Sequence, residues 1–367
     1  MLKVEVLMGE GFDIWLHSYF LVGLIQLAQR NEVKLSFVRN PDWTCCKVLL
    51  HDGYPLFTIK CTDNACNYSR IISFDPKDQS DAWQIRALDE CDVYFKRSTY
   101  APDTGCLTKS QQLKVLPINP MFATWSSDAP VWTLRTCVDF VRTSLGQLSS
   151  RRSLRTTINA LIKSSYGLAT LSSLNHYEDA PTSFKRKQIL FQTRLWDPEQ
   201  EDGSRVEACN NERVEMVRIL RNKLGRRLVG GLIRTPFSEK HYPDLLSDLT
   251  PTSRVKRPEF IRLCRQFLVR VNIKALFDAT PYSLGESLAA NNCLVSQTIR
   301  NNFASPLVEG KHYLGFTTPD ECVDVCLELL NSDEKANILR KEAHEYYRTA
   351  VRPVEAMKTF LTLAMSR

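Results

Sequence analysis

The sequence predicts an α/β protein that consists of two facing Rossmann-like domains. The chain has 367 residues, and a single hydrophobic core rarely grows that large. Short apolar runs typical of buried strands alternate with longer stretches of helical periodicity, which is the pattern of a parallel sheet covered by helices. This alternation occurs twice, on either side of a polar, serine-rich stretch at 167–181.

In the first half, strands are expected where apolar and β-branched residues follow one another between turn residues. These strands are expected at 3–8, 33–38, 47–50, 56–61, 70–74, 92–95 and 113–116. Apolar residues at helical spacing predict helices at 14–29, 82–88 and 130–148, with a further one from 149.

The second half repeats the alternation. Strands are expected at 188–195, 227–233, 271–277 and 293–296. Helices are expected at 205–224, 257–267, 283–290, 319–330 and 333–347. A last helix is expected to begin at Pro353, because proline fits the first turn of a helix. We therefore predict domains at 1–180 and 181–347, followed by a closing helix in 348–367.

Composition limits the classes of partner. The net charge is +7, and the basic residues gather in patches such as 151–155, 185–187, 221–227 and 254–257, which suit phosphates or a membrane surface. No nucleic-acid-binding motif accompanies them, so nucleic acid is not expected as a partner. No signal peptide and no membrane-spanning run is visible. We expect a cytoplasmic protein with peripheral membrane contact as one option.

Twelve cysteines are present, but no pair has the CxxC spacing. None forms a four-ligand zinc set with histidine, and no acidic metal motif stands in a suitable context. We expect reduced, mostly apolar thiols, no metal and no resident cofactor.

The most informative segment is 277–286, where a strand leads into a helix. Backbone amides at the helix start, at Tyr282, Ser283 and Leu284, are suited to bind a diphosphate with help from the helix dipole. Asp278 is expected at the end of the strand, and Glu286 one turn into the helix on the same side. A carboxylate at Glu286 can accept hydrogen bonds from the hydroxyls of a ribose.

A local explanation competes with this one. Ser283 and Glu286 have the spacing of a capping box, in which the two side chains bond the backbone at the helix start. The two interpretations are compatible, since a well-capped helix start is also a well-ordered anion site.

Residues 278–296 resemble retaining glycosyltransferases of the GT-B type, family 4-like members of the glycosyltransferase family 1 superfamily. Their pattern is Glu, seven residues, Glu, and then a helix. Here Asp278 replaces the first Glu, and Asn291-Asn292 stands where the family usually has a glycine. Glu286 matches best, and the resemblance implies ribose binding for it. The resemblance covers about residues 188–347.

The order of neighbouring segments is also similar to that family. The segment 306–321 resembles the one that follows the donor site. Arg194, at the end of the strand 188–195, matches the basic residue that meets the diphosphate, and guanidinium groups pair well with phosphate oxygens. Asp197-Pro198-Glu199 stands where the second basic residue is expected, and Arg234 is a possible substitute. The helix from Pro353 resembles the family's C-terminal helix, which crosses back to the first domain.

The N-terminal domain is expected on the acceptor side. Lys96 and Arg97 follow a strand and are candidates to hold a phosphorylated ligand, with a structural role as the alternative. Asp13 and His17 are further acceptor-side candidates. A single histidine on a helix is more often packed or on the surface, and as a general base His17 would imply an inverting reaction.

These observations predict a glycosyltransferase that moves a sugar from a nucleotide diphosphate sugar, its co-substrate, to a saccharide or lipid-linked acceptor. Arg194 and the helix-start amides would stabilise the leaving diphosphate, with Asp278 beside the sugar. The resemblance favours retention and metal independence. The alternatives are a catalytically silent nucleotide-sugar-binding or scaffold protein, and an inverting transferase or epimerase on the same fold.

Overall fold

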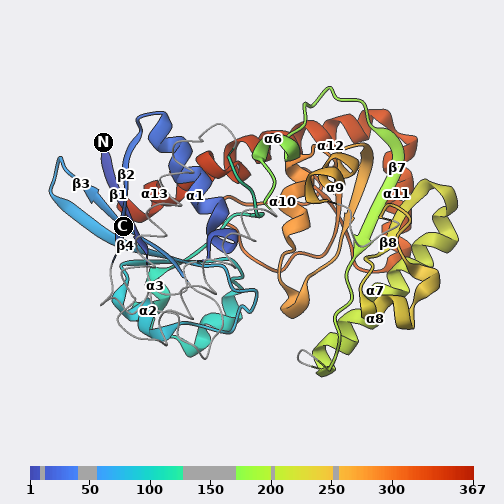
Figure 1. Ribbon diagram of the computed structural model, residues 1–367, viewed down its shortest axis with the longest axis horizontal. Helices are drawn as coiled ribbons and strands as arrows, with labels where there is room; N and C mark the ends of the chain where they lie inside the picture. Colours follow the sequence, from blue (N-terminus) through green and yellow to red (C-terminus); the bar gives the residue numbers. More distant parts are fainter. Residues whose placement is uncertain (9–12, 40–55, 127–170, 200–202, 251–255) are drawn as a thin grey trace. The chain divides into compact units, whose positions relative to one another are not determined.

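The computed structural model describes residues 1–8, 13–39, 56–126, 171–199, 203–250 and 256–367. The chain divides into two compact units, each of helices and strands (Figure 1). Unit 1 comprises Met1–Leu174, Asn301–Ser305 and Thr349–Arg367, and unit 2 comprises Asn175–Arg300 and Pro306–Arg348. The strand predicted at 47–50 and the helices predicted at 130–148 and from 149 lie outside the described residues.

The sheet of unit 1 has the strand order β2-β1-β3-β4-β5-β6. Its strands are β1 (Leu2–Met8), β2 (Val33–Arg39), β3 (Phe57–Asp63), β4 (Tyr68–Asp75), β5 (Val93–Lys96) and β6 (Val115–Pro117). The expectation of a purely parallel sheet is wrong here, because β3 runs antiparallel to both β1 and β4. The turn at 64–67 is too short for a parallel crossover, so β3 and β4 form a hairpin.

Short helices and one long helix accompany this sheet. They are α1 (Ile14–Gln29), α2 (Ile85–Glu90), η2 (Ala101–Cys106) and α3 (Lys109–Lys114). The core is rich in aromatic side chains, in which Phe20 lies on Phe74 at 4.7 Å between ring centroids and Phe74 stacks on Phe95 at 5.0 Å. Buried aromatic pairs of this kind add to the stabilisation that comes from apolar burial.

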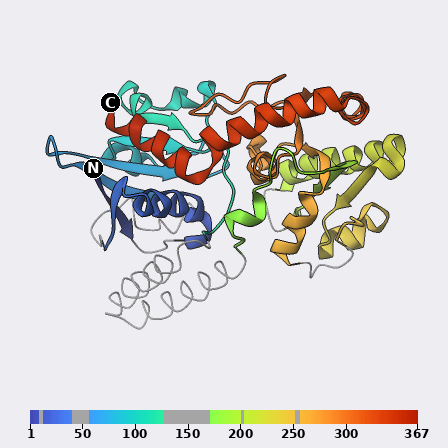
Figure 2. The ribbon, with the colours of Figure 1, turned by 90° about the horizontal axis from the view of Figure 1, so that it is seen from above.

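The C-terminal helix α13 (Pro353–Met365) belongs to unit 1, as the sequence predicted. It packs beside α1 (Figures 1 and 2). Gly23 makes this close approach possible, because a Cβ atom there would lie 2.3 Å from Met357 Cγ. Tyr19 donates a 2.5 Å hydrogen bond to the Val351 carbonyl, and the Phe360 ring lies 5.0 Å from that of Phe95.

Unit 2 contains the predicted parallel sheet, with the strand order β11-β10-β9-β7-β8. Its strands are β7 (Arg186–Thr193), β8 (Leu228–Leu232), β9 (Phe267–Asn272), β10 (Cys293–Gln297) and β11 (Leu314–Phe316). The helices are α6 (Leu174–Tyr177), α7 (Gly203–Leu224), η3 (Gly225–Arg227), α8 (Pro236–His241), η4 (Pro243–Leu245), α9 (Arg257–Cys264), η5 (Leu276–Asp278), α10 (Tyr282–Ala289), α11 (Pro319–Asn331), α12 (Asp333–Tyr346) and the π-helical turn η6 (Tyr347–Val351).

The chain changes direction across this sheet between β7 and β9. From β7 it crosses through α7 to β8 on one side, and then returns to build β9, β10 and β11 on the other. In open α/β sheets, ligands bind outside the carboxyl ends of the strands at such a switch point. The topology therefore directs attention to the loops that follow β7 and β9.

One predicted strand is displaced. The strand expected at 271–277 is β9 at Phe267–Asn272, and the helix expected at 257–267 is α9, which ends at Cys264. A short apolar run adjoining a helix does not reveal by its periodicity where the helix ends. The connection between β9 and α10 therefore runs from Ile273 to Pro281, which is longer than the connection expected between the predicted strand and helix.

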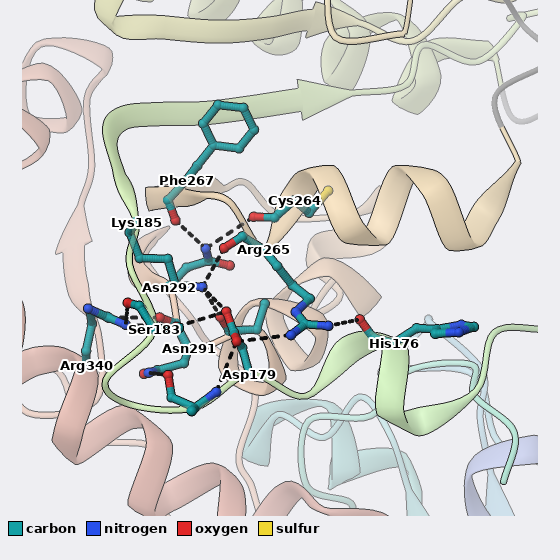
Figure 3. A network of polar contacts seen from close by, with 12 residues as sticks. His176, Asp179, Ser183, Lys185, Cys264, Arg265, Phe267, Asn291, Asn292 and Arg340 are labelled. Atoms are coloured by element: carbon teal, nitrogen blue, oxygen red, sulfur yellow. Dashed lines mark hydrogen bonds and ion pairs between the residues drawn. The ribbon is translucent and has the colours of Figure 1, made fainter. Parts of the chain in front are cut away.

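Buried charges tie together the amino ends of β7, β9 and β10 (Figure 3). The Lys185 side chain is only 1% exposed. Its ammonium donates to Asp179 Oδ2 at 2.6 Å, to the Arg265 carbonyl at 2.5 Å and to the Ala290 carbonyl at 2.7 Å. Arg265 also binds Asp179, at 3.0 Å. One ammonium thus joins the segments that precede three strands.

Asn291 has a backbone conformation that favours glycine. It has φ +52° and follows α10. The amide of Asn291 donates to the Leu288 carbonyl and that of Asn292 to the Ser287 carbonyl, which is the Schellman arrangement at a helix end. This left-handed position favours glycine, and asparagine is one of the few other residues that tolerate it. Asn291 therefore ends α10 in a position where glycine would also fit.

We predict that the Lys185 contacts make stability depend on alkaline pH. Burial lowers the pKa of Lys185 from 10.5 to about 8, despite the opposing effect of Asp179. Between these two values the unfolded chain binds more protons than the folded one, so the free energy of unfolding should rise with pH. Denaturant unfolding from pH 7 to 10.5 should show this rise in the wild type relative to K185M. Parallel pH profiles for the two proteins would contradict it.

We predict that the thiols react in two groups. Cys66 and Cys106 are exposed, whereas Cys61, Cys91, Cys264, Cys293, Cys322 and Cys326 are buried. Burial raises the pKa of Cys264 to about 11 and that of Cys293 to about 12, and the protonated thiol is a poor nucleophile. Iodoacetamide labelling followed by peptide mass spectrometry should modify the exposed pair in the native protein and the buried set only after unfolding. Equal labelling of both sets would refute this grouping.

Candidate functional site

The candidate site lies at the carboxyl ends of β7 and β9 in unit 2. Arg194 follows β7 directly and is exposed. Within the described part of the chain, its guanidinium has no hydrogen bond or ion pair. Lys274 lies two residues beyond the end of β9, with its side chain 38% exposed. Two cations therefore follow the two strands of the switch point.

Arg213, from α7, holds the two loops together. Its side chain is buried, with the residue only 5% exposed. Its Nη1 donates to the Arg194 carbonyl at 2.6 Å, and its Nη2 donates to the Lys274 carbonyl at 3.0 Å. The guanidinium also lies 4.0 Å from the centre of the Trp196 ring. Because the fork of a guanidinium is rigid, the two backbone segments are fixed side by side.

Sequence reasoning missed Arg213. It lies in the interior of the predicted helix 205–224 among several charged residues, and nothing in the local pattern distinguishes it from a solvated side chain. Burial lowers its pKa, but an arginine remains charged over the whole working range of pH. A buried charge of this kind is stable only when it is hydrogen-bonded, and here two carbonyl groups provide the partners.

Charged groups of alternating sign surround the loop after β9. Lys274 lies 3.2 Å from Asp278 and 3.7 Å from Glu212. Asp278 also pairs with Arg300 at 2.8 Å. Gln297, at the end of β10, donates to Glu212 and accepts from the Lys274 amide at 3.2 Å. The loops after β9 and β10 are thereby joined to α7.

Asp278 lies elsewhere than predicted. It was expected at the end of a strand, but it occupies the short turn η5, after β9 has ended at Asn272. Phe277 and Asp278 both have positive φ, at 62° and 55°. Consecutive left-handed residues other than glycine are uncommon and cluster at functional sites. Although partial burial acts in the opposite direction, Lys274 and Arg300 hold the pKa of Asp278 below its ordinary value.

The start of α10 excludes the capping-box interpretation. The helix begins at Tyr282, its N-cap is Pro281, and no side chain caps it. Ser283 lies inside the first turn, and its hydroxyl bonds the side chain of Asn272. The Leu284 amide, which was predicted to face a diphosphate, donates instead to the Pro281 carbonyl at 3.1 Å. Diphosphate contact by Tyr282 and Ser283 remains a prediction.

Glu286 is 5% exposed and pairs with two arginines. Its Oε1 binds Arg257, at the start of α9, and its Oε2 lies 3.0 Å from Arg270 in β9. Both carboxylate oxygens are therefore engaged within unit 2, and ribose binding stays a prediction. Replacing Glu286 with alanine would leave the buried Arg270 without this partner, so such a variant would test folding as much as ligand binding.

Arg234 follows β8, the edge strand next to β7. Its guanidinium lies 3.5 Å from Glu239 in α8, and its side chain is 28% exposed. Arg234 is therefore on the opposite side of β7 from the loop after β9. Contact of Arg234 with the diphosphate stays a prediction.

The acceptor-side candidates in unit 1 have structural partners. Asp13 caps α1 by accepting from the Leu16 amide at 3.1 Å. His17 is fully buried, with its ring 5.5 Å from that of Phe57, so the geometry favours the packed interpretation.

The two cations at the end of β5 are also engaged. Lys96 is fully buried and pairs with Asp75 at 3.0 Å, and Arg97 is 7% exposed and pairs with Asp78. Tyr94 donates to the same Asp75 carboxylate at 2.7 Å. The proposal that Lys96 holds a phosphorylated ligand is contradicted by this geometry, because its charge is sequestered, and the structural alternative holds.

Two kinds of feature are absent from the described residues. No group of three or more His, Cys, Asp or Glu side chains among them is arranged to hold a metal ion. No helix in the same part of the chain is long and apolar enough to cross a membrane.

Two kinds of sequence comparison found nothing: no family model matches the chain, and no curated protein matches it significantly. Solved structures show distant likenesses. An α-glucosyltransferase in complex with UDP is 10% identical, with both chains covered completely and a TM-score of 0.43. A putative UDP-N-acetylglucosamine 2-epimerase from Listeria monocytogenes is 11% identical, with 99% of this chain and 96% of that chain covered and a TM-score of 0.41.

A third similar structure is the C-terminal domain of a glycosyl transferase group 1 family protein from Francisella tularensis. It is 10% identical, with 48% of this chain and 96% of that chain covered and a TM-score of 0.33. At these identities and TM-scores, the likenesses do not define a function. The class that the topology itself defines is a two-unit α/β protein whose second unit is a Rossmann-like parallel sheet.

We predict that Arg213 contributes strongly to the stability of unit 2. R213M leaves the carbonyl groups of Arg194 and Lys274 without their donor, and the loss should lower the free energy of unfolding by about 2–3 kcal/mol. Chemical denaturation measures this change. R218M is the matched control, because Arg218 is exposed on the same helix and should change stability by less than about 0.5 kcal/mol. Equal effects of the two variants would contradict the structural role.

Proposed function

We propose that this chain transfers a glycosyl group from a nucleotide diphosphate sugar, and that the donor binds at the carboxyl ends of β7 and β9. The observation that carries the proposal is the switch point of the parallel sheet, where the exposed Arg194 guanidinium has no hydrogen bond or ion pair to the residues that the structure describes. Such a cation, fixed at the usual ligand edge of a Rossmann-like sheet, suits a phosphate group. The resemblance of 278–296 to GT-B glycosyltransferases points to the same edge.

The proposed chemistry is stabilisation of a leaving group. The bond between the sugar's anomeric carbon and the diphosphate breaks, and the oxygen of the acceptor hydroxyl forms the new glycosidic bond to that carbon. The hydroxyl proton passes to an oxygen of the departing diphosphate, so the products are the glycosylated acceptor and a nucleoside diphosphate. Negative charge grows on the diphosphate during this step. Arg194, held in place before the reaction, opposes that charge without reorganisation. Asp278, ionised beside Lys274 and Arg300, is proposed to lie near the sugar.

The proposal also covers the stereochemistry of the reaction, the acceptor and the location of the protein. The family resemblance favours retention of configuration and a reaction without a metal. A saccharide or lipid-linked acceptor, and peripheral contact of a cytoplasmic protein with a membrane through its basic patches, are proposed from charge alone. An inverting reaction with His17 as the general base is not favoured, because His17 is completely buried.

A silent nucleotide-sugar-binding protein is the second candidate. One observation favours it: the unit 1 cations proposed for acceptor binding, Lys96 above all, are engaged in ion pairs. Binding and turnover separate the two candidates, because a transferase hydrolyses its donor slowly when no acceptor is present, whereas a binding protein leaves it intact.

We predict that the full chain binds a nucleotide diphosphate sugar through Arg194. Calorimetry with UDP-, GDP- and ADP-sugars should identify the donor, and release of the nucleoside diphosphate should report turnover. R194M should weaken donor binding by about 10- to 100-fold, as expected for the loss of charge-assisted hydrogen bonds. R226M is the matched control, because Arg226 is exposed at the amino end of β8. Failure of every donor to bind the wild type would overturn the proposed function.

A further inference from the structure

The proposed donor site needs a second cation beside Arg194, and the residues that follow Arg194 in the sequence do not provide one. After β7, the positions where a second basic residue was expected are Asp197-Pro198-Glu199. A diphosphate carries charge on two phosphate groups, and a single guanidinium does not neutralise both. Another cation at the same edge of the sheet would complete such a site.

Lys274 meets this requirement better than Arg234. Arg234 follows the edge strand β8 and pairs with Glu239. Lys274 follows β9, the second strand of the switch point, and its carbonyl is bound by the same guanidinium that binds the Arg194 carbonyl. The positions from which the Arg194 and Lys274 side chains extend are thus fixed next to each other by Arg213.

The present partners of Lys274 are easily exchanged. Its ammonium pairs with Asp278 at 3.2 Å and Glu212 at 3.7 Å. All three side chains are more than a third exposed, at 38% for Lys274, 39% for Asp278 and 35% for Glu212. Ion pairs with this exposure contribute little to stability. A phosphate oxygen forms a stronger, charge-assisted hydrogen bond. After such an exchange, Asp278 would still have Arg300 as a partner, at 2.8 Å.

We propose that Lys274 is the second diphosphate-binding residue of this chain, beside Arg194, and that Arg213 is the positioning residue that holds the two loops in register. This inference rests on the proposed function and specifies how its site selects a ligand. A nucleoside monophosphate reaches only one of the two cations. The preference for a diphosphate over the matching monophosphate therefore measures the contribution of the second cation.

The test is calorimetry on the full chain with UDP, GDP and ADP and with UMP, GMP and AMP. The wild type should bind one nucleoside diphosphate more tightly than its monophosphate. K274M should reduce this preference at least about tenfold, as expected for one charge-assisted hydrogen bond, and leave monophosphate binding nearly unchanged. K274R should restore most of the preference. K223M is the matched control, because Lys223 also pairs with a carboxylate, Asp320, away from the proposed site on the surface of unit 2.

R213K tests the positioning role, because lysine keeps the charge but lacks the rigid planar fork whose two nitrogens donate to the Arg194 and Lys274 carbonyl groups. A folded R213K protein should lose most of the diphosphate preference although Arg194 and Lys274 are both present, and an unchanged preference would overturn that role. If the wild type binds none of the nucleoside diphosphates, both the proposed function and this inference fail. If the wild type binds one and K274M keeps the full preference, Lys274 is refuted and the proposed function stands.

Discussion

The double hydrogen bond of Arg213 is the constraint on which the geometry of the candidate site depends. One buried guanidinium binds the carbonyl groups of Arg194 and Lys274, which follow the two central strands of the switch point. A parallel sheet aligns the ends of its strands, but it does not fix the loops beyond them. Because the guanidinium is planar and rigid, it also fixes the backbone just beyond the ends of β7 and β9. The exposed side chains of both loops therefore start from fixed positions.

The charged residues at the amino ends of the unit 2 strands differ in burial from those at the carboxyl ends. At the amino edge, Lys185 is buried and satisfied by Asp179 and two carbonyl groups. At the carboxyl ends, Lys274 and Asp278 are partly exposed, and the Arg194 guanidinium has no partner among the described residues. Buried, fully bonded charges specify structure, whereas exposed and exchangeable charges remain available to a ligand. This contrast agrees with the general placement of ligands at the carboxyl ends of parallel strands.

The sequence predicted the elements that carry several candidate residues, but it did not predict the contacts of those residues. Arg194 was expected at the end of a strand and is found there. Glu286 was weighed as a ribose ligand or a capping residue, whereas it pairs with Arg257 and Arg270, which lie 29 and 16 residues away along the chain. Lys96 was considered for ligand binding, yet it is buried against Asp75. Contacts between distant segments leave no local periodicity, so sequence patterns do not reveal them.

The sequence by itself determined the alternation of strands and helices, the parallel sheet of unit 2 and the closing helix, because apolar periodicity and turn residues are local signals. It also marked Asn291 as a replacement for glycine, although only the structure showed the left-handed backbone that explains it. The tertiary structure alone decided the antiparallel pairing of β3, the bridge made by Arg213 and the partners of each buried charge. Strand order and ion pairing depend on which segments meet in space, and the same side chain can be solvated or buried without any change in its neighbours along the chain.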